Sequence, residues 1–266
     1  MRVVLFAWVS LVACAPPDPG STRIIGHGGS GAAADAPMNS QESLLGALRL
    51  GIDGIELDAQ LTADSVLVAF HAMRLEDGTG CTGMMNSRTW AELGNCGLSS
   101  AGASLPLVRV DSLLIRAIAA YPTVEFTLDC KLLTEGDWWQ YLQAFSDAVL
   151  ELDDHPALHG RILVECQSLD FLRLLGLKRK GFPTFYYATE FVGSIDLARS
   201  ADCAGITMMH DRLDQEQAER IRSAGLSLTL FGASSEWSHR HAFSLRPDRL
   251  QTDLPAYAMG LRRSAH

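Results

Sequence analysis

Short apolar runs alternate along the chain with longer segments in which apolar residues recur every three or four positions. Short runs predict strands and periodic segments predict helices. We expect strands at 23–26, 53–58, 65–71, 123–131, 161–167, 183–188, 204–208, 226–231 and 249–252. We expect helices at 40–50, 110–120, 137–150, 169–178, 194–199 and 214–223, a short one near Trp237 and a closing one from Pro255. This alternation predicts one α/β domain of about eight βα units.

The alternation favours a (β/α)8 TIM barrel over an open, doubly wound sheet. Gly26 ends the first strand and Gly28 and Gly29 follow it, but these glycines do not open a helix, and the acidic residue that a dinucleotide-binding site requires is missing. Residues 72–105 show no long period, and we expect them to form a small loop insertion after the second strand. The barrel domain is therefore predicted to span residues 23–266.

Composition narrows the possible partners. The net charge of −9 argues against nucleic acid, whose phosphates bind basic surfaces. It also argues against electrostatic adhesion to an anionic membrane. We also expect the protein to be a monomer.

The N-terminus is typical of an exported protein. Arg2 precedes an apolar run that is too short to span a membrane and fits a secretory signal. The run ends in LVAC, which resembles a bacterial lipobox and implies that residues 1–14 form a lipoprotein signal peptide and lipobox, with a lipid on Cys14. The linker, residues 15–22, is rich in proline and therefore stiff. An ordinary signal peptide cleaved near Ala15 is the alternative. We expect an envelope protein that contacts the membrane through its lipid anchor only.

Export implies an oxidising compartment, so cysteine pairing becomes relevant. Cys81 and Cys96 lie in the same Gly- and Ser-rich stretch and could form a disulfide. Cys130, Cys166 and Cys203 lie in apolar, strand-like segments, which is typical of small buried side chains. The chain contains no CxxC pair, so a zinc site is not expected.

The segment IDGIELDAQ, residues 52–60, places two acids in an apolar strand. Alternate side chains share a face, so Glu56 and Asp58 point the same way. Two unpaired buried carboxylates would cost several kcal/mol, so a positive partner is expected between them. A divalent metal is one candidate and an arginine or lysine is the other.

Other chemically capable residues gather at the ends of strands, where barrels place their chemistry. Three carboxylates suit Mg²⁺ or Ca²⁺, and two imidazoles suit acid–base catalysis. Taken singly, a histidine could be structural, and an Asp-x-Lys pair could be a plain ion pair. Histidines in helix or loop contexts, His239 among them, are expected to be solvated. The converging set is His27, Glu56, Asp58, His71, Asp129 and Lys131.

This ordered set resembles the glycerophosphodiester phosphodiesterases, metal-dependent (β/α)8 barrels that cleave a phosphodiester next to glycerol. The resemblance covers nearly the whole predicted domain. It lies in IGHGG at 25–29, APMNS at 36–40, GIELD at 54–58, TLDCK at 127–131 and QTDLP at 251–255. It implies a metal-dependent hydrolase that releases glycerol phosphate and an alcohol from a small-molecule or lysolipid phosphodiester.

The resemblance also implies roles for single residues. Glu56, Asp58 and Asp129 would hold one Mg²⁺ or Ca²⁺. His27 and His71 would be the catalytic pair, one acting as base or nucleophile and the other protonating the leaving alkoxide. Lys131 would help to bind the phosphate.

The chain departs from the family pattern at three positions. Gly28 stands where the family usually has Arg, Ala72 where it has Asp, and Asp129 where it has Glu. Asp-x-Lys without that Arg is closer to the sphingomyelinase D/phospholipase D toxins, which can form a cyclic phosphate but lack the TD-x-P ending. A catalytically degenerate barrel that only binds a phosphorylated ligand is a further alternative.

Overall fold

The protein folds as a closed barrel of eight parallel strands. The computed structural model describes residues 22–32, 34–100 and 103–264. The barrel strands are β1 (Arg23–Gly26), β2 (Gly54–Leu61), β7 (Glu125–Cys130), β8 (Ile162–Cys166), β9 (Thr184–Tyr187), β10 (Gly205–Met209), β11 (Ser227–Ala233) and β12 (Arg249–Thr252). Because β1 pairs with both β2 and β12, the sheet closes on itself. The predicted TIM barrel is confirmed.

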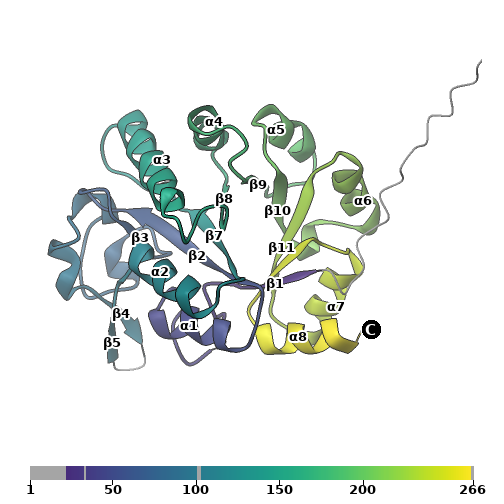
Figure 1. The fold of residues 1–266 in the computed structure, drawn as a ribbon, viewed down its shortest axis with the longest axis horizontal. Helices are drawn as coiled ribbons and strands as arrows, with labels where there is room; N and C mark the ends of the chain where they lie inside the picture. The colour runs from purple at the N-terminus through teal and green to yellow at the C-terminus, as the bar shows by residue number, and fades with distance from the viewer. Residues whose placement is uncertain (1–21, 33, 101–102, 265–266) are drawn as a thin grey trace, which may run out of the picture.

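Within the described residues, eight helices surround the strands in chain order (Figure 1). They are α1 (Gln41–Arg49), α2 (Val110–Ala120), α3 (Trp138–Asp154), α4 (Leu169–Lys178), α5 (Ser194–Ser200), α6 (Gln215–Ser223), α7 (Glu236–Ser244) and α8 (Pro255–Ser264). Five begin at a side chain that accepts a backbone N–H of the first turn, namely Ser40, Asp137, Ser168, Asp214 and Ser235. These caps satisfy N–H groups that lack a partner within the helix, so they define where the helices begin.

The strands carry apolar side chains outward and polar side chains inward. Ile55 and Leu57 of β2 are fully buried members of the main apolar core. Glu56 and Asp58 alternate with them and are almost as buried, at 1% and 2% exposure. Most TIM barrels fill this interior with branched apolar residues. Buried acids in their place indicate that the upper barrel interior is a binding site.

Strand β2 is longer than the sequence predicts. Residues 54–59 pair with β7, but residues 59–61 pair antiparallel with β3 (Leu67–Ala69). The predicted strand at 53–58 was therefore too short, and its two acids lie within the strand, not at its end. The β3 segment returns the chain toward the barrel, where the N–H of Phe70 donates to the carbonyl of Asp58 at 2.9 Å. This return places His71 beside the barrel mouth.

The insertion between β3 and α2 is compact. It contains the hairpin of β4 (Gly97–Ser100) and β5 (Ala103–Pro106), followed by β6 (Val108–Arg109), which pairs with β3. It has a small apolar core of its own, which includes Phe70 and Leu93. Three short 3₁₀ turns precede the hairpin, at Leu75–Asp77, Met85–Ser87 and Glu92–Asn95.

The predicted N-terminal elements lie almost entirely outside the described residues. These are the signal peptide at 1–14, the lipidation site Cys14 and all of the linker at 15–22 except Thr22. Within the described part of the chain, no helix is both long and apolar enough to cross a bilayer.

Candidate active site

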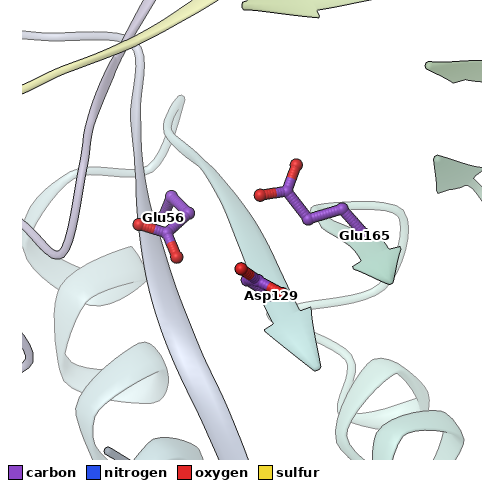
Figure 2. Close-up of side chains that lie close together, drawn as sticks. All are labelled: Glu56, Asp129 and Glu165. Carbon is purple, nitrogen blue, oxygen red and sulfur yellow. The ribbon is translucent and has the colours of Figure 1, made fainter. Parts of the chain in front are cut away.

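Three buried carboxylates from neighbouring strands meet inside the upper barrel. Oxygen atoms of Glu56 on β2, Asp129 on β7 and Glu165 on β8 lie within 4.8 Å of one another (Figure 2). Glu165 was missed from the sequence, although it lies in the strand expected at 161–167. It is level with Asp129 in the β7–β8 register. The alternation of inward and outward side chains that identified Glu56 in its strand would also have identified Glu165 in this one.

Asp58 joins the site but lies outside that closest group. It is level with Asp129 in the β2–β7 register. Its Oδ1 lies 3.0 Å from Nζ of Lys131, and its Oδ2 accepts from Nδ2 of Asn39 at 2.6 Å. Lys131 also lies 2.5 Å from Oδ2 of Asp129, so the lysine bridges the two aspartates. Of the two partners considered for the acids, the lysine is therefore present in the structure.

The electrostatics of the pocket favour a further cation. Burial, and then repulsion from Asp58, raises the pKa of Glu56 well above its ordinary value. Burial also raises the pKa of Asp129, although Lys131 opposes this shift. The pKa of Glu165 rises to about 7, first through burial and then through repulsion from Asp129. Buried carboxylate oxygens in excess of the local positive charge are a donor set that fits Mg²⁺ or Ca²⁺.

His27 is held by an acid from the last strand. It directly follows β1, and Asp253 directly follows β12, the strand with which β1 pairs. Nδ1 of His27 lies 2.8 Å from Oδ1 of Asp253. Burial lowers the pKa of His27, but the Asp253 hydrogen bond and the nearby carboxylates outweigh this effect and raise it to about 9. The contact leaves Nε2 of His27 available for proton transfer.

His239 corrects one expectation. We expected it to be solvated, but it is fully buried on α7. Its Nδ1 faces the carbonyl of Ser235 at 2.6 Å, and its Nε2 lies 2.6 Å from Oγ1 of Thr252. That hydroxyl also accepts from the N–H of Leu254 at 2.9 Å. Helix α7 therefore fixes the turn that carries Asp253, and this packing partner could not be inferred from the sequence.

The backbone conformation and the crowding at Gly28 explain why the residue after His27 is a glycine and not an arginine. Its φ of +53° is a left-handed conformation that favours glycine, and an added Cβ would lie 2.5 Å from Cε of Met38. Its N–H donates to Oε2 of Glu56 at 2.7 Å. The position therefore orients a candidate metal ligand instead of supplying an arginine for the phosphate.

His71 is exposed, and Gln60 holds the segment that carries it. Nε2 of the buried Gln60 donates to the carbonyls of Phe70 at 2.9 Å and Ala72 at 2.8 Å. These carbonyls flank His71, which lies close enough to interact electrostatically with Asp129. The structure thus brings all six predicted rim residues to one end of the barrel, and it adds Glu165, Asn39 and Asp253.

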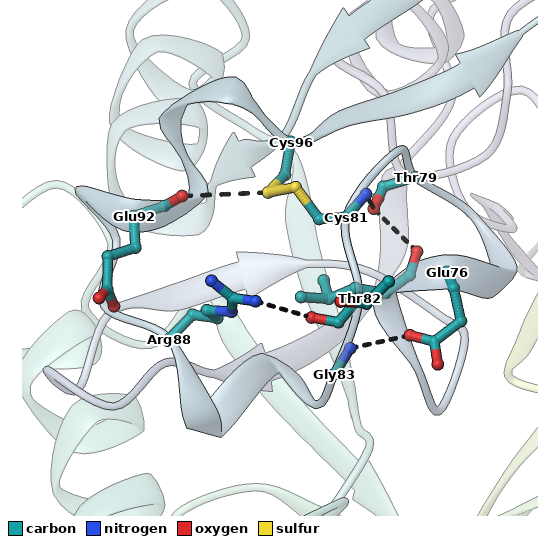
Figure 3. Close-up of a disulfide and its surroundings, with 9 residues drawn as sticks. Glu76, Thr79, Cys81, Thr82, Gly83, Arg88, Glu92 and Cys96 are labelled. Atoms are coloured by element: carbon teal, nitrogen blue, oxygen red, sulfur yellow. Dashed lines mark hydrogen bonds between the residues drawn. A yellow bond between two sulfur atoms is a disulfide. The ribbon is translucent and has the colours of Figure 1, made fainter.

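Cys81 and Cys96 are joined by a disulfide within the insertion, with Cα atoms 5.5 Å apart (Figure 3). The insertion contacts the loop that follows Lys131, because Nδ2 of Asn86 donates to Oγ1 of Thr134 at 2.6 Å and to the carbonyl of Glu135 at 3.0 Å. The crosslinked segment therefore braces one side of the barrel mouth. Cys130, Cys166 and Cys203 are buried free thiols, as expected.

Fold and site together define a TIM barrel with an acidic pocket beneath two histidines, an arrangement suited to metal-assisted hydrolysis. Residues 30–256 match the model of the glycerophosphoryl diester phosphodiesterase family, and the chain belongs to this family.

Individual relatives are distant. A probable glycerophosphodiester phosphodiesterase 2 of Mycobacterium tuberculosis is 32% identical over 95 residues, which are 36% of this chain and 33% of that protein. The chain thus matches about a third of that relative's length. A solved putative glycerophosphoryl diester phosphodiesterase from Silicibacter pomeroyi superposes with a TM-score of 0.80 at 19% identity, covering 91% of this chain and 93% of that one. An Oleispira antarctica phosphodiesterase, solved with its product sn-glycerol-3-phosphate, gives a TM-score of 0.75 at 20% identity, covering 90% and 95%.

Proposed function

We propose that the protein is a metal-dependent glycerophosphodiester phosphodiesterase, which hydrolyses its substrate to glycerol phosphate and an alcohol. Membership of the family and the product bound by the Oleispira antarctica enzyme support this reaction class. The observation that carries the proposal is the meeting of buried carboxylates, a lysine and two histidines at one end of the barrel.

Glu56, Asp58 and Asp129 would hold a divalent cation, which when bound would neutralise charge on a non-bridging phosphate oxygen. Lys131 lies at the edge of this pocket, with its side chain 22% exposed. Its ammonium group has three donors, so it can turn part of its hydrogen bonding toward a phosphate oxygen. Gly28 and Asn39 keep the carboxylates of Glu56 and Asp58 in place.

His27 and His71 carry the proton transfers in this proposal. Asp253 keeps a proton on Nδ1 of His27 and directs Nε2 to the substrate. One imidazole removes a proton from the attacking oxygen or attacks directly, and the other protonates the leaving oxygen. Protonation is needed because an aliphatic alkoxide is a poor leaving group.

The test is turnover of glycerophosphocholine and lysophosphatidylcholine, followed by phosphorus NMR. We expect an open glycerol phosphate product, loss of activity after exhaustive chelation, and recovery with Mg²⁺ or Ca²⁺. A cyclic phosphate would support the sphingomyelinase D-like alternative. Binding of substrate without turnover under any metal condition would support the degenerate-barrel alternative, and full activity after chelation would refute the metal site.

We also propose that the mature protein is a monomer that is lipid-anchored through Cys14 at the cell envelope. The lipobox-like LVAC and the proline-rich linker support this placement. Fatty-acid labelling of the wild type but not of a Cys14→Ser variant is the expected result. Labelling of both, or of neither, would contradict the anchor, and light scattering on the purified protein tests the oligomeric state.

A further inference from the structure

Glu165 occupies a place in the acidic pocket that none of the predicted roles uses. In register, Asp58 of β2 pairs with Asp129 of β7, and Asp129 pairs with Glu165 of β8. Three adjacent strands thus present a carboxylate at the same level. Figure 2 shows the Glu165 side chain extending from β8 toward Glu56 and Asp129. Only 2% of the residue is exposed.

The partners of Glu165 orient it but do not neutralise it. Nε2 of Gln251 on β12 donates to its two oxygens at 2.8 and 2.9 Å, and Oγ1 of Thr207 on β10 donates to Oε2 at 2.7 Å. Both donors are uncharged. Strand β12 lies across the barrel from β8, and β10 is separated from β8 by β9 alone. The two donors aim the carboxylate at the pocket and leave its charge without a counterion.

Other buried acids of this protein are compensated differently. Glu125, at the opposite end of the barrel interior, forms ion pairs with Arg23 and Arg249. Asp153, on α3, pairs with Arg179. Among the described residues, no lysine, arginine or histidine nitrogen forms an ion pair with Glu165 (within 4.0 Å). An ionised buried carboxylate without a partner is unfavourable by several kcal/mol, so this position favours a cation that the protein itself does not supply.

Lys131 affects how the other acids can contribute. It occupies one oxygen of Asp58 and one of Asp129, and Asn39 takes the second oxygen of Asp58. Among the described pocket carboxylates, Glu56 and Glu165 are the ones that form no ion pair with a lysine, arginine or histidine within 4.0 Å.

We propose that Glu165 is a further ligand of the divalent cation, oriented by Gln251 and Thr207, and that with Glu56 and Asp129 it forms the deep side of the site. The inference rests on the proposed metal dependence and extends it to a residue outside the predicted ligand set. A ligand of this kind raises affinity by adding negative charge and one more oxygen.

The test is calorimetric titration of the metal-free full-length protein with Mg²⁺, Ca²⁺ and Mn²⁺. Glu165→Gln keeps the size of the side chain and an oxygen that can accept from Gln251. We expect it to bind each ion at least about tenfold more weakly than the wild type, as metal-site substitutions typically do. The control is Glu125→Gln, which removes a buried carboxylate from the interior but far from the pocket, and it should bind the ions as the wild type does.

Thermal unfolding gives a second readout that separates a ligand from a structural acceptor. If Glu165 is a ligand, saturating metal raises the Tm of Glu165→Gln less than the Tm of the wild type. If Glu165 only accepts hydrogen bonds, saturating metal raises the Tm of both proteins equally, whatever the Tm of the metal-free variant. Glu165→Asp, which keeps the charge and withdraws the carboxylate by one methylene, should also bind the ions more weakly.

The outcomes distinguish the two proposals. Wild-type protein that binds no divalent ion would overturn the metal site as a whole. Wild-type protein that binds, together with Glu165→Gln and Glu165→Asp variants that bind equally well, would overturn only the role of Glu165.

Discussion

Replacing Asp253 with asparagine tests how the barrel prepares His27. The change keeps the shape of the side chain and removes the charge 2.8 Å from Nδ1. Raising the pKa of His27 from 6.5 to about 9 corresponds to about 3 kcal/mol. Asp253 shares this effect with Glu56 and Asp58, so we assign roughly half, on the order of 1–2 kcal/mol, to Asp253. Because asparagine can face Nδ1 with either its oxygen or its amide, the imidazole also loses its fixed orientation.

Two measurements follow from this substitution. Turnover should fall about a hundredfold, which is the usual scale of acid–base catalysis. In metal-free protein, the stabilising effect of protonated His27 is fully present below pH 6.5 and is lost as the pH rises through about 9. The loss of unfolding free energy in Asp253→Asn should therefore be largest near pH 6 and shrink toward pH 10. Urea denaturation across this range measures it, with Asp211→Asn as an exposed-carboxylate control.

Nitrogen NMR of labelled histidine adds a readout that is independent of activity. The wild type should show a protonated Nδ1 at His27, and the Asp253→Asn variant should show a mixture of tautomers. Wild-type turnover in the variant, or a stability difference that grows with pH, would refute the positioning role of Asp253.

Three further predictions concern the remaining site and the insertion. His27→Ala and His71→Ala should each cut turnover at least about a hundredfold and barely change calorimetric metal affinity; loss of metal binding with rescue by excess metal would reverse this assignment. Gln60→Leu should lower turnover about tenfold while metal affinity stays constant, because the carbonyls flanking His71 lose their donor; full turnover would show that the segment holds its position unaided. Non-reducing peptide mapping should recover Cys81 linked to Cys96, and replacing both by serine should cost about 3 kcal/mol of stability for a separation of 15 residues; two alkylatable thiols would contradict the pairing.

The barrel could be predicted from the sequence because its strands and helices differ in apolar period. The ends of strands were predicted less accurately where pairing with a distant segment determines them. Strand β2 continues to Leu61 because β3 returns to pair with its last residues, a long-range contact that no local pattern encodes. The same contact explains how His71, outside the barrel strands, reaches the mouth.

Six residues of the candidate site were predicted from the sequence, but Glu165 and the contacts between the site residues were not. The alternation in β2 marked Glu56 and Asp58, and the position of Asp129 at a strand end marked the third acid. The Asp253 partner of His27 follows from barrel closure, because the first and last strands must be neighbours. The burial of His239 and the hydrogen bonds to Glu165 depend on packing between distant segments, which the sequence does not reveal.

The acidic interior would couple folding to the proposed metal binding. Burial raises the pKa values of Glu56, Asp129 and Glu165 in the folded protein. The contribution of each carboxyl to folding stability therefore decreases as the pH rises above its pKa in the unfolded chain. For Glu165, the stabilising proton is present below its unfolded value and is lost as the pH rises through about 7. A divalent cation that binds the folded site reverses this loss, because binding to the native state alone stabilises it. The pocket carboxylates thus contribute least to the stability of the metal-free fold at neutral and alkaline pH, where metal binding at the proposed site would restore the most stability.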